Sequence, residues 1–355
     1  MGLKPDMPFP ELVAKAKNLL ETSANPVIIS WRGGRHPQWY RSIANFADTF
    51  AMPVINYAGE VVNYPASGNM AIDRFDLSRA DLIMVIEDEV PWIPKDFDPS
   101  VPVIRIDSDP FFTNIPYYGI GVTLSVRAGV SDFLDVLRPN INREVLEDRR
   151  HRISEMHLKQ LKDKSEEIRR LSKSARIHPR YLSDEIGKLK VTMITEYQID
   201  PRYAMPEEFG SYFATPSAGY LGLSLGAGVG YSMATGKDVV IGTGDGAFIF
   251  GVPSAFGYIA HDQPVLCAIY DNGGWLASSL SVNDLFPDGM ARKSGRYPGA
   301  DLKRYSIGKV IESFGGSYMM IEDPGEVRDA LREGLKIIRE ERRPAVIQFV
   351  VEASR

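Results

Sequence analysis

Short apolar runs alternate along most of the chain with stretches whose apolar residues recur at helical spacing. One such helical pattern covers residues 39–50, between the first two runs. Continuous apolar runs between helical patterns are typical of parallel strands that helices cover on both faces. The pattern therefore predicts an α/β fold made of two doubly wound parallel-sheet domains. The runs cover residues 26–30, 53–56, 81–86 and 102–107 in the first half, and 191–195, 238–242, 265–270 and 345–351 in the second.

A polar stretch separates the two halves. Residues 140–173 are dense in Arg, Lys and Glu and carry no strand pattern. Their charges alternate in sign, which favours ion pairs one helical turn apart. We expect a solvated helical linker over residues 140–175, between a first domain at 1–139 and a second at 176–355. In the second domain, residues 219–234 and 247–259 are expected to be helical.

Composition excludes several classes of protein. The 355 residues carry a net charge of −5, which argues against a nucleic-acid partner. The single cysteine, Cys267, lies in an apolar run and is expected in the core, which excludes a disulfide framework and a cysteine-held iron–sulfur cluster. No apolar run approaches the roughly 18–20 residues that span a bilayer. The first residues lack a signal-peptide core, so we expect a cytoplasmic protein.

The candidate chemistry lies in two glycine-rich turns. Gly244-Asp245-Gly246 is followed, after twenty-five residues, by Asn272-Gly273-Gly274. One residue separates each turn from the predicted strand before it. Open α/β sheets bind ligands at the carboxyl ends of their strands, and glycines let an anion approach backbone amides. Asp245, the amide oxygen of Asn272 and a carbonyl near Gly274 could hold Mg²⁺ against a diphosphate. Gly-Asp-Gly alone is a common turn, so the pairing with Asn272 carries this prediction.

The stretch from Gly244 to Gly274 resembles the diphosphate motif of thiamine diphosphate (ThDP) enzymes. It is similar in detail to the superfamily of acetolactate synthase, benzoylformate decarboxylase and 2-hydroxyacyl-CoA lyase. Asp271 stands where that motif has its first asparagine; the metal ligand is the second, which is Asn272 here. The resemblance implies ThDP and Mg²⁺ as cofactors. It implies cofactor contacts at Gly244, Asp245, Gly246, Ala247, Asn272, Gly274 and Trp275.

Two further segments resemble the same superfamily. Residues 217–222 resemble its Gly-Thr-Met-Gly segment, which implies that the Gly219 carbonyl accepts a hydrogen bond from the cofactor's amino group. Leu221, beside Tyr220, would then prop the cofactor in its bent conformation, although ordinary core packing of Leu221 is the alternative. Glu196 resembles a glutamate that borders the cofactor cleft.

The first half resembles the middle domain of these enzymes, which in some members binds FAD, ADP or CoA. Arg32, Gly33 and Arg35 follow the first predicted strand and could meet a phosphate, or could form a plain solvated loop. Asp107 could meet an adenosine moiety. We therefore keep a nucleotide site in the first domain as one expectation.

The resemblance begins at the middle domain and includes no pyrimidine-binding domain. That domain carries the glutamate that activates the cofactor, so no catalytic residue is assigned in this chain. We expect a separate small subunit to supply it, in a hetero-oligomer of 2+2 composition.

The expected function is that of one subunit of a ThDP- and Mg²⁺-dependent C–C lyase, carboligase (transferase) or decarboxylase. Its activity would be 2-hydroxyacyl-CoA lyase-like or acetolactate synthase-like, on a 2-oxo acid or an acyl-CoA. A subunit of a 2-oxoacid oxidoreductase and a non-catalytic ThDP- or nucleotide-binding regulatory module are the alternatives. Residues 275–305 could grip an anionic substrate through Arg292, Lys293, Arg296 and Lys303, or form a plain surface loop.

Overall fold

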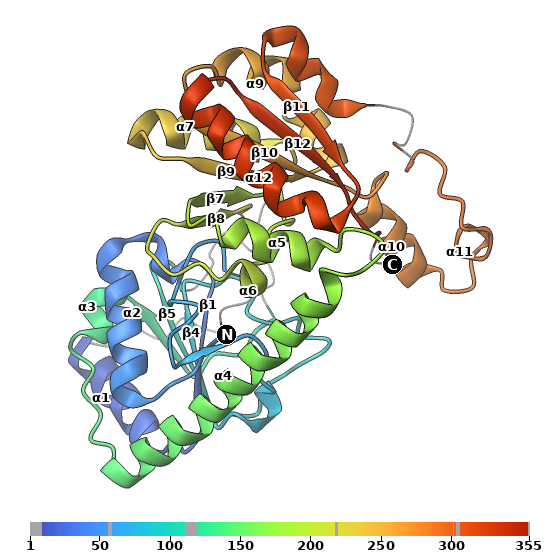
Figure 1. Ribbon diagram of the computed structural model, residues 1–355. Helices are drawn as coiled ribbons and strands as arrows, with labels where there is room; N and C mark the ends of the chain where they lie inside the picture. The colour runs from blue at the N-terminus through green and yellow to red at the C-terminus, as the bar shows by residue number, and fades with distance from the viewer. Residues whose placement is uncertain are drawn as a thin grey trace. The chain divides into compact units, whose positions relative to one another are not determined.

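The chain divides into two compact units, each built on its own sheet. The computed structural model describes residues 9–55, 59–110, 119–216, 219–300, 302 and 306–353. Unit 1 runs to Lys164 and includes Met205–Ser211; unit 2 comprises Ser165–Ala204 and the chain from Tyr212 onward. Each unit contains a six-stranded sheet (Figure 1), and every strand pair is parallel. The two sheets with their flanking helices confirm the predicted α/β fold class.

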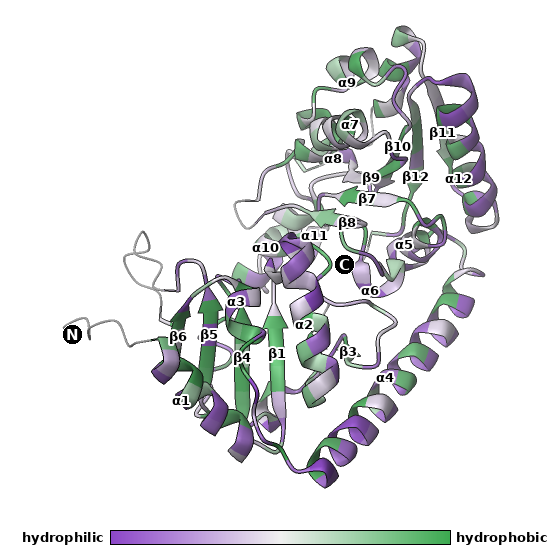
Figure 2. Cartoon of the chain, turned by 90° about the vertical axis from the view of Figure 1, so that its left-hand side faces the viewer, coloured by the Kyte–Doolittle hydropathy of each residue, from purple (hydrophilic) through white to green (hydrophobic). Residues whose placement is uncertain are grey.

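The sheet of unit 1 has the strand order β3-β2-β1-β4-β5-β6. Every residue of β1, β4 and β5 is buried, as expected for strands that are covered on both faces. Figure 2 shows the hydrophobic character of these strands. The strands are β1 (Pro26–Ser30), β2 (Val54–Ile55), β3 (Ala71–Ile72), β4 (Leu82–Ile86), β5 (Val103–Asp107) and β6 (Leu124–Arg127), with helices α1 (Phe9–Thr22), α2 (Pro37–Phe50) and α3 (Val130–Leu134) and short 3₁₀ turns at Gly33–Arg35 and Leu77–Arg79.

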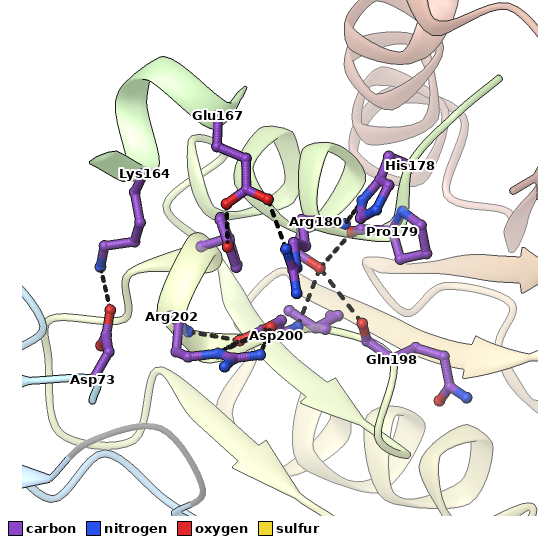
Figure 3. Close-up of polar contacts among 12 residues, drawn as sticks. Asp73, Lys164, Glu167, His178, Pro179, Arg180, Gln198, Asp200 and Arg202 are labelled. Atoms are coloured by element: carbon purple, nitrogen blue, oxygen red, sulfur yellow. Dashed lines mark hydrogen bonds and ion pairs between the residues drawn. The ribbon is translucent and has the colours of Figure 1, made fainter. Parts of the chain in front are cut away.

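Helix α4 (Arg143–Leu171) occupies most of residues 140–175, the range predicted to be a linker. It is not solvated on all sides, because Arg149 is buried and donates hydrogen bonds to the carbonyls of Ser23 and Phe50 in unit 1. Near the end of its unit 1 portion, Lys164 pairs with Asp73 at 2.7 Å (Figure 3). The helix is therefore an integral part of unit 1 over much of its length. Among the described residues, no helix is long and apolar enough to cross a membrane.

The sheet of unit 2 has the strand order β11-β12-β10-β9-β7-β8. Its centre is apolar, and Cys267 on β10 is fully buried as a free thiol between Ile241 and Val346, which confirms its expected place in the core. The strands are β7 (Thr192–Thr195), β8 (Tyr212–Ala214), β9 (Val239–Gly244), β10 (Val265–Asp271), β11 (Ser317–Ile321) and β12 (Ala345–Val350). The helices are α5 (Pro179–Gly187), α6 (Pro201–Ala204), α7 (Leu223–Thr235), α8 (Asp245–Phe250), α9 (Pro253–Ile259), α10 (Leu276–Leu285), α11 (Met290–Ser294) and α12 (Val327–Lys336), with 3₁₀ turns at Ile307–Phe314 and Pro324–Glu326 and a π turn at Ile337–Glu341.

Polar contacts fix the segment from the end of α4 to Ala204 within unit 2. The Glu167 carboxylate, near the end of α4, accepts hydrogen bonds from Arg180 on α5 and from the Tyr203 hydroxyl on α6, each at 2.6 Å. The Asp200 carboxylate accepts hydrogen bonds from the guanidinium of Arg202 (Figure 3). These contacts hold the loop after β7, from which Glu196 and Gln198 extend.

Two helices differ from the sequence prediction. The range 247–259 was expected to form one helix, but α8 and α9 are separate, because Val252 has a φ of +52° and Pro253 cannot continue the preceding turn. The glycine-rich helix begins at Leu223 rather than at Gly219. Gly219 and Gly222 have φ values of +69° and +87°, so residues 219–222 form a turn ahead of the helix.

Candidate cofactor site

The two glycine-rich turns lie side by side at the carboxyl edge of the unit 2 sheet. Asp245 is the first residue of α8, directly after β9, and Asp271 ends β10. Strands β9 and β10 are parallel neighbours, with Gly244 opposite Tyr270. The expectation that both turns meet at one sheet edge is therefore confirmed.

The Asp245 carboxylate is buried, and only one of its two oxygens has a hydrogen-bond partner among the described residues. Its side chain is 3% exposed, and Oδ1 accepts a hydrogen bond from the Gly246 amide at 2.9 Å. Oδ2 has no hydrogen-bond partner among the described residues. Burial, together with the nearby Asp271 carboxylate, raises the pKa of Asp245 to about 7. A buried carboxylate oxygen without a partner fits a cation, which would supply the missing contact.

Asp271 is held by two donors. Its Oδ1 accepts from the Gly273 amide at 2.9 Å, and its Oδ2 accepts from Gln348 Nε2 at 2.6 Å. The Oε1 of Gln348 in turn accepts from the Tyr318 hydroxyl at 2.7 Å. A carboxylate satisfies both donors, whereas an asparagine side chain would offer only one acceptor oxygen. Gln348 and Tyr318 were not singled out in the sequence, because both lie far from the motif along the chain.

The second turn is shaped by close contacts. Gly273 has a φ of +82°, and its carbonyl accepts from the Leu302 amide at 3.0 Å. The Trp275 amide donates to the Ala300 carbonyl at 2.9 Å, so Ala300 and Leu302 are both tied to this turn. A Cβ on Gly246 would lie 2.3 Å from the Trp275 ring, so close packing against this ring requires a glycine at position 246. The Gly274 carbonyl accepts from the Leu276 amide at 2.9 Å.

A cavity of about 940 Å³ opens at these turns within unit 2. Its size falls within the range typical of small-molecule sites. In the described ranges, no three His, Cys, Asp or Glu side chains cluster so as to hold a metal. The expected Mg²⁺ site would not form such a cluster, because it uses one carboxylate, one amide oxygen and one carbonyl, completed by diphosphate oxygens. The lining includes Asp245, Asp271, Asn272, Gly274, Trp275, residues 295–300, Val350 to Ala353 and Arg176.

The Glu196 carboxylate caps the glycine-rich helix. Glu196 is 1% exposed; its Oε2 accepts from the Gly222 amide at 2.7 Å and its Oε1 from the Ser224 amide at 2.5 Å. A Cβ on Gly222 would lie 2.5 Å from the Phe250 backbone, so this turn packs against the end of α8. Glu196 therefore positions the turn at residues 219–222 relative to the helix that Asp245 begins.

The side chains expected to contact the rest of the cofactor are exposed. Tyr220 is 62% and Leu221 is 45% exposed, so Leu221 does not pack in the core. Ser217 and Ala218, the first residues of the segment used for the resemblance, lie outside the described residues. The roles of Gly219, Tyr220, Leu221 and Ala247 toward the cofactor stay predictions.

Gln198 also lies beside the site, although no sequence pattern pointed to it. Its Nε2 lies 2.9 Å from the position of a Cβ on Gly244, and its Oε1 is buried without a hydrogen-bond partner in the described structure. Its amide therefore packs against the Gly244-Asp245 turn, apart from the residues that line the cavity.

The carboxyl edge of the unit 1 sheet carries paired charges. Arg32 contacts Glu89 at 2.7 Å and Arg35 contacts Glu87 at 3.0 Å. Burial, and then the nearby Asp107 carboxylate, raise the pKa of Glu87. A Cβ on Gly33 would lie 2.4 Å from the Ser30 hydroxyl, so close packing accounts for the glycine at this position. A phosphate at this edge would compete with both glutamates, and the nucleotide site stays a prediction.

Comparison with known proteins found a family match that lies largely in unit 2. Residues 194–349 match the family described as thiamine pyrophosphate enzyme, C-terminal TPP binding domain. Oxalyl-CoA decarboxylase of Escherichia coli K12 is 20% identical over 98% of this chain and 62% of its own length. Acetolactate synthase of Bacillus subtilis 168 is 20% identical over 92% of this chain and 59% of its own.

A solved structure shares the fold. The thiamine diphosphate-dependent 4-hydroxybenzoylformate decarboxylase of Rhodococcus jostii RHA1 superposes with a TM-score of 0.73 at 16% identity, over 99% of this chain and 66% of that protein. The chain thus spans about 62% of the length of its first curated relative. These matches confirm the expected relation to thiamine diphosphate enzymes.

Proposed function

We propose that this relative of the thiamine diphosphate enzymes binds ThDP with Mg²⁺ in unit 2. The observation that carries the proposal is Asp245 Oδ2, a buried and unpartnered carboxylate oxygen at the sheet edge where Asn272 also emerges. Asp245, the Asn272 amide oxygen and the Gly274 carbonyl would hold the metal. The amides at the start of α8 would favour the diphosphate.

The chain's own residues bind and orient the cofactor, which supplies an electron sink for making or breaking C–C bonds. Glu196 fixes the turn at residues 219–222, which presents the Gly219 carbonyl and the Leu221 side chain. Burial of Asp245 raises its pKa, so the metal replaces a proton there and binding strengthens as pH rises toward neutrality.

We propose a C–C lyase, carboligase or decarboxylase reaction on a 2-oxo acid or an acyl-CoA. The names of the relatives, an acetolactate synthase and a decarboxylase of an acyl-CoA, support these substrate classes. In the segment 275–305, Arg292 and Lys293 on α11 are exposed and available to an anionic substrate, whereas Lys303 lies outside the described residues.

We also propose that the pyrimidine half of the cofactor is bound by a partner subunit in a cytoplasmic hetero-oligomer. The extra length of the relatives supports this, since roughly two fifths of each has no counterpart in the present sequence. Purification from native cells with mass spectrometry tests it. A co-purifying small chain supports the proposal, and a single longer chain that includes this sequence contradicts it.

The test of cofactor binding is calorimetry of the full chain with ThDP and Mg²⁺. Asp245→Ala and Asn272→Ala should weaken Mg²⁺-dependent binding at least about tenfold, because each removes a metal ligand. Unchanged affinity in both variants would refute the ligand assignment. Turnover by the isolated chain, assayed with a panel of 2-oxo acids and 2-hydroxyacyl-CoAs, would refute the dependence on a partner.

A further inference from the structure

Two arginines line the cofactor cavity and have no role in the metal site. They are Arg176, between α4 and α5, and Arg296, after α11. Both side chains are exposed, and neither guanidinium has an ion pair or side-chain hydrogen bond with another described residue. Among the described residues of the lining they are the cationic ones, against Asp245, Asp271 and Glu352.

Backbone contacts hold each arginine at the turn that carries Asp271. Ile177, next to Arg176, accepts the Glu352 amide at 2.8 Å, and the Val351 amide donates to the Asp271 carbonyl at 2.8 Å. Residue 176 is thereby linked to the end of β10 through two hydrogen bonds.

Arg296 is held from the other side of the same turn. The Ala300 carbonyl accepts from the Trp275 amide, and the Leu302 amide donates to Gly273. The stretch that carries Arg296 is therefore closed against residues 273–275. The two cations come from distant parts of the sequence to one cavity.

The charge balance of the site calls for such cations. A diphosphate carries several negative charges, and Asp245 adds another. One Mg²⁺ would neutralise only part of this total. Asp271 adds a negative charge at the position where the resembling motif has a neutral asparagine. Guanidinium groups suit phosphate oxygens because their N–H donors form paired, charge-assisted hydrogen bonds.

We propose that Arg176 and Arg296 bind the diphosphate of the cofactor and offset the negative charge of Asp271. The inference rests on the proposed function, because it assumes that a diphosphate occupies this cavity. It adds two binding residues to a site otherwise made of a metal, a helix start and glycine turns.

The test uses the full chain with Mg²⁺ and inorganic pyrophosphate, a probe that needs no pyrimidine site. Trp275 lines the cavity, so its fluorescence can follow binding, with calorimetry as a second readout. Arg176→Gln and Arg296→Gln should each raise the Kd about tenfold or more. Lys237→Gln and Lys309→Gln, exposed cations of unit 2 outside the cavity lining, are the controls and should leave the Kd unchanged within about twofold.

A double-mutant cycle tests the link to Asp271. If the arginines offset its charge, Arg296→Gln should weaken binding less in an Asp271→Asn background than in the wild type. Thermal unfolding and circular dichroism of each variant confirm that it is folded.

The outcomes separate the two proposals. If the wild type binds pyrophosphate and ThDP while both arginine variants bind equally well, the inference is wrong and the proposed function stands. If control and arginine variants weaken binding alike, the effect is general charge and the inference is also wrong. If the wild type binds neither ligand with Mg²⁺, both proposals fail.

Discussion

Asp271 contributes to the electrostatics of the candidate site. As a carboxylate it accepts from both the Gly273 amide and Gln348, so it is fixed in place. In that position it adds to the effect of burial on Asp245, which raises the Asp245 pKa. A cation at the proposed site would relieve the repulsion between both carboxylates, so metal binding and diphosphate binding would be electrostatically linked.

Asp88 carries a pH-dependent cost to stability in unit 1. Burial raises the pKa of Asp88 from its ordinary value of 3.8 to about 6, against the opposing effects of the Val90 amide and Arg105. Between those two pH values the folded chain keeps a proton that the unfolded chain has lost. Stability therefore falls as pH rises through that window and levels off above it.

Asp88→Asn should remove this cost. The variant is expected to be more stable than the wild type above pH 6, by up to about 3 kcal/mol, with the difference vanishing below about pH 4. Its amide oxygen can still accept from the Val90 amide, which lies 3.0 Å from Asp88 Oδ1. Denaturant unfolding at several pH values measures the difference, with the exposed Asp98→Asn as control. A difference independent of pH would contradict the assignment.

At the scale of secondary structure, the sequence predicted the central strands and missed the edges. The eight apolar runs correspond to β1, β2, β4, β5, β7, β9, β10 and β12, each with neighbours on both sides. The missed strands β3, β6, β8 and β11 are the four edge strands. They are short or partly exposed, because an edge strand is covered by fewer neighbours, and so they lack a continuous apolar run.

The residues of the candidate site also divide into those that the sequence marks and those that it does not. Asp245 and Asn272 could be found from sequence because each follows a central strand within a recognisable glycine turn. Gln198, Gln348 and Arg176 could not, because nothing near them in the sequence marks them. Only the parallel order of the unit 2 strands brings the segments that follow β7, β9, β10 and β12 to one edge of the sheet.

Glu196 connects β7 with helix α7, and its removal should loosen that helix. Glu196→Ala leaves the Gly222 and Ser224 amides without their acceptor, which should cost about 1–3 kcal/mol of stability. Glu196→Gln keeps one acceptor oxygen and should lose less. Thermal unfolding compares the variants; an Ala variant as stable as the wild type would show that water replaces the cap.

At the scale of the whole molecule, the two units should respond differently to ligand. Mg²⁺ with ThDP is expected to protect backbone amides of unit 2 around residues 219–224, 244–251 and 271–276, because binding favours the closed forms of these segments. Unit 1, described from residue 9 to 164 with gaps, should be unchanged. Hydrogen exchange with and without ligand measures this, and equal protection of both units would contradict a site built within unit 2.

The buried thiol of Cys267 is a natural probe for the rate at which the centre of unit 2 opens. It is the sole cysteine of the sequence, and burial raises its pKa, so the folded thiol is both shielded and protonated. A thiol-reactive dye can therefore label only molecules whose β10 has separated from its neighbours. With reagent in excess, the labelling rate reports how often the centre of unit 2 opens, without any engineered cysteine.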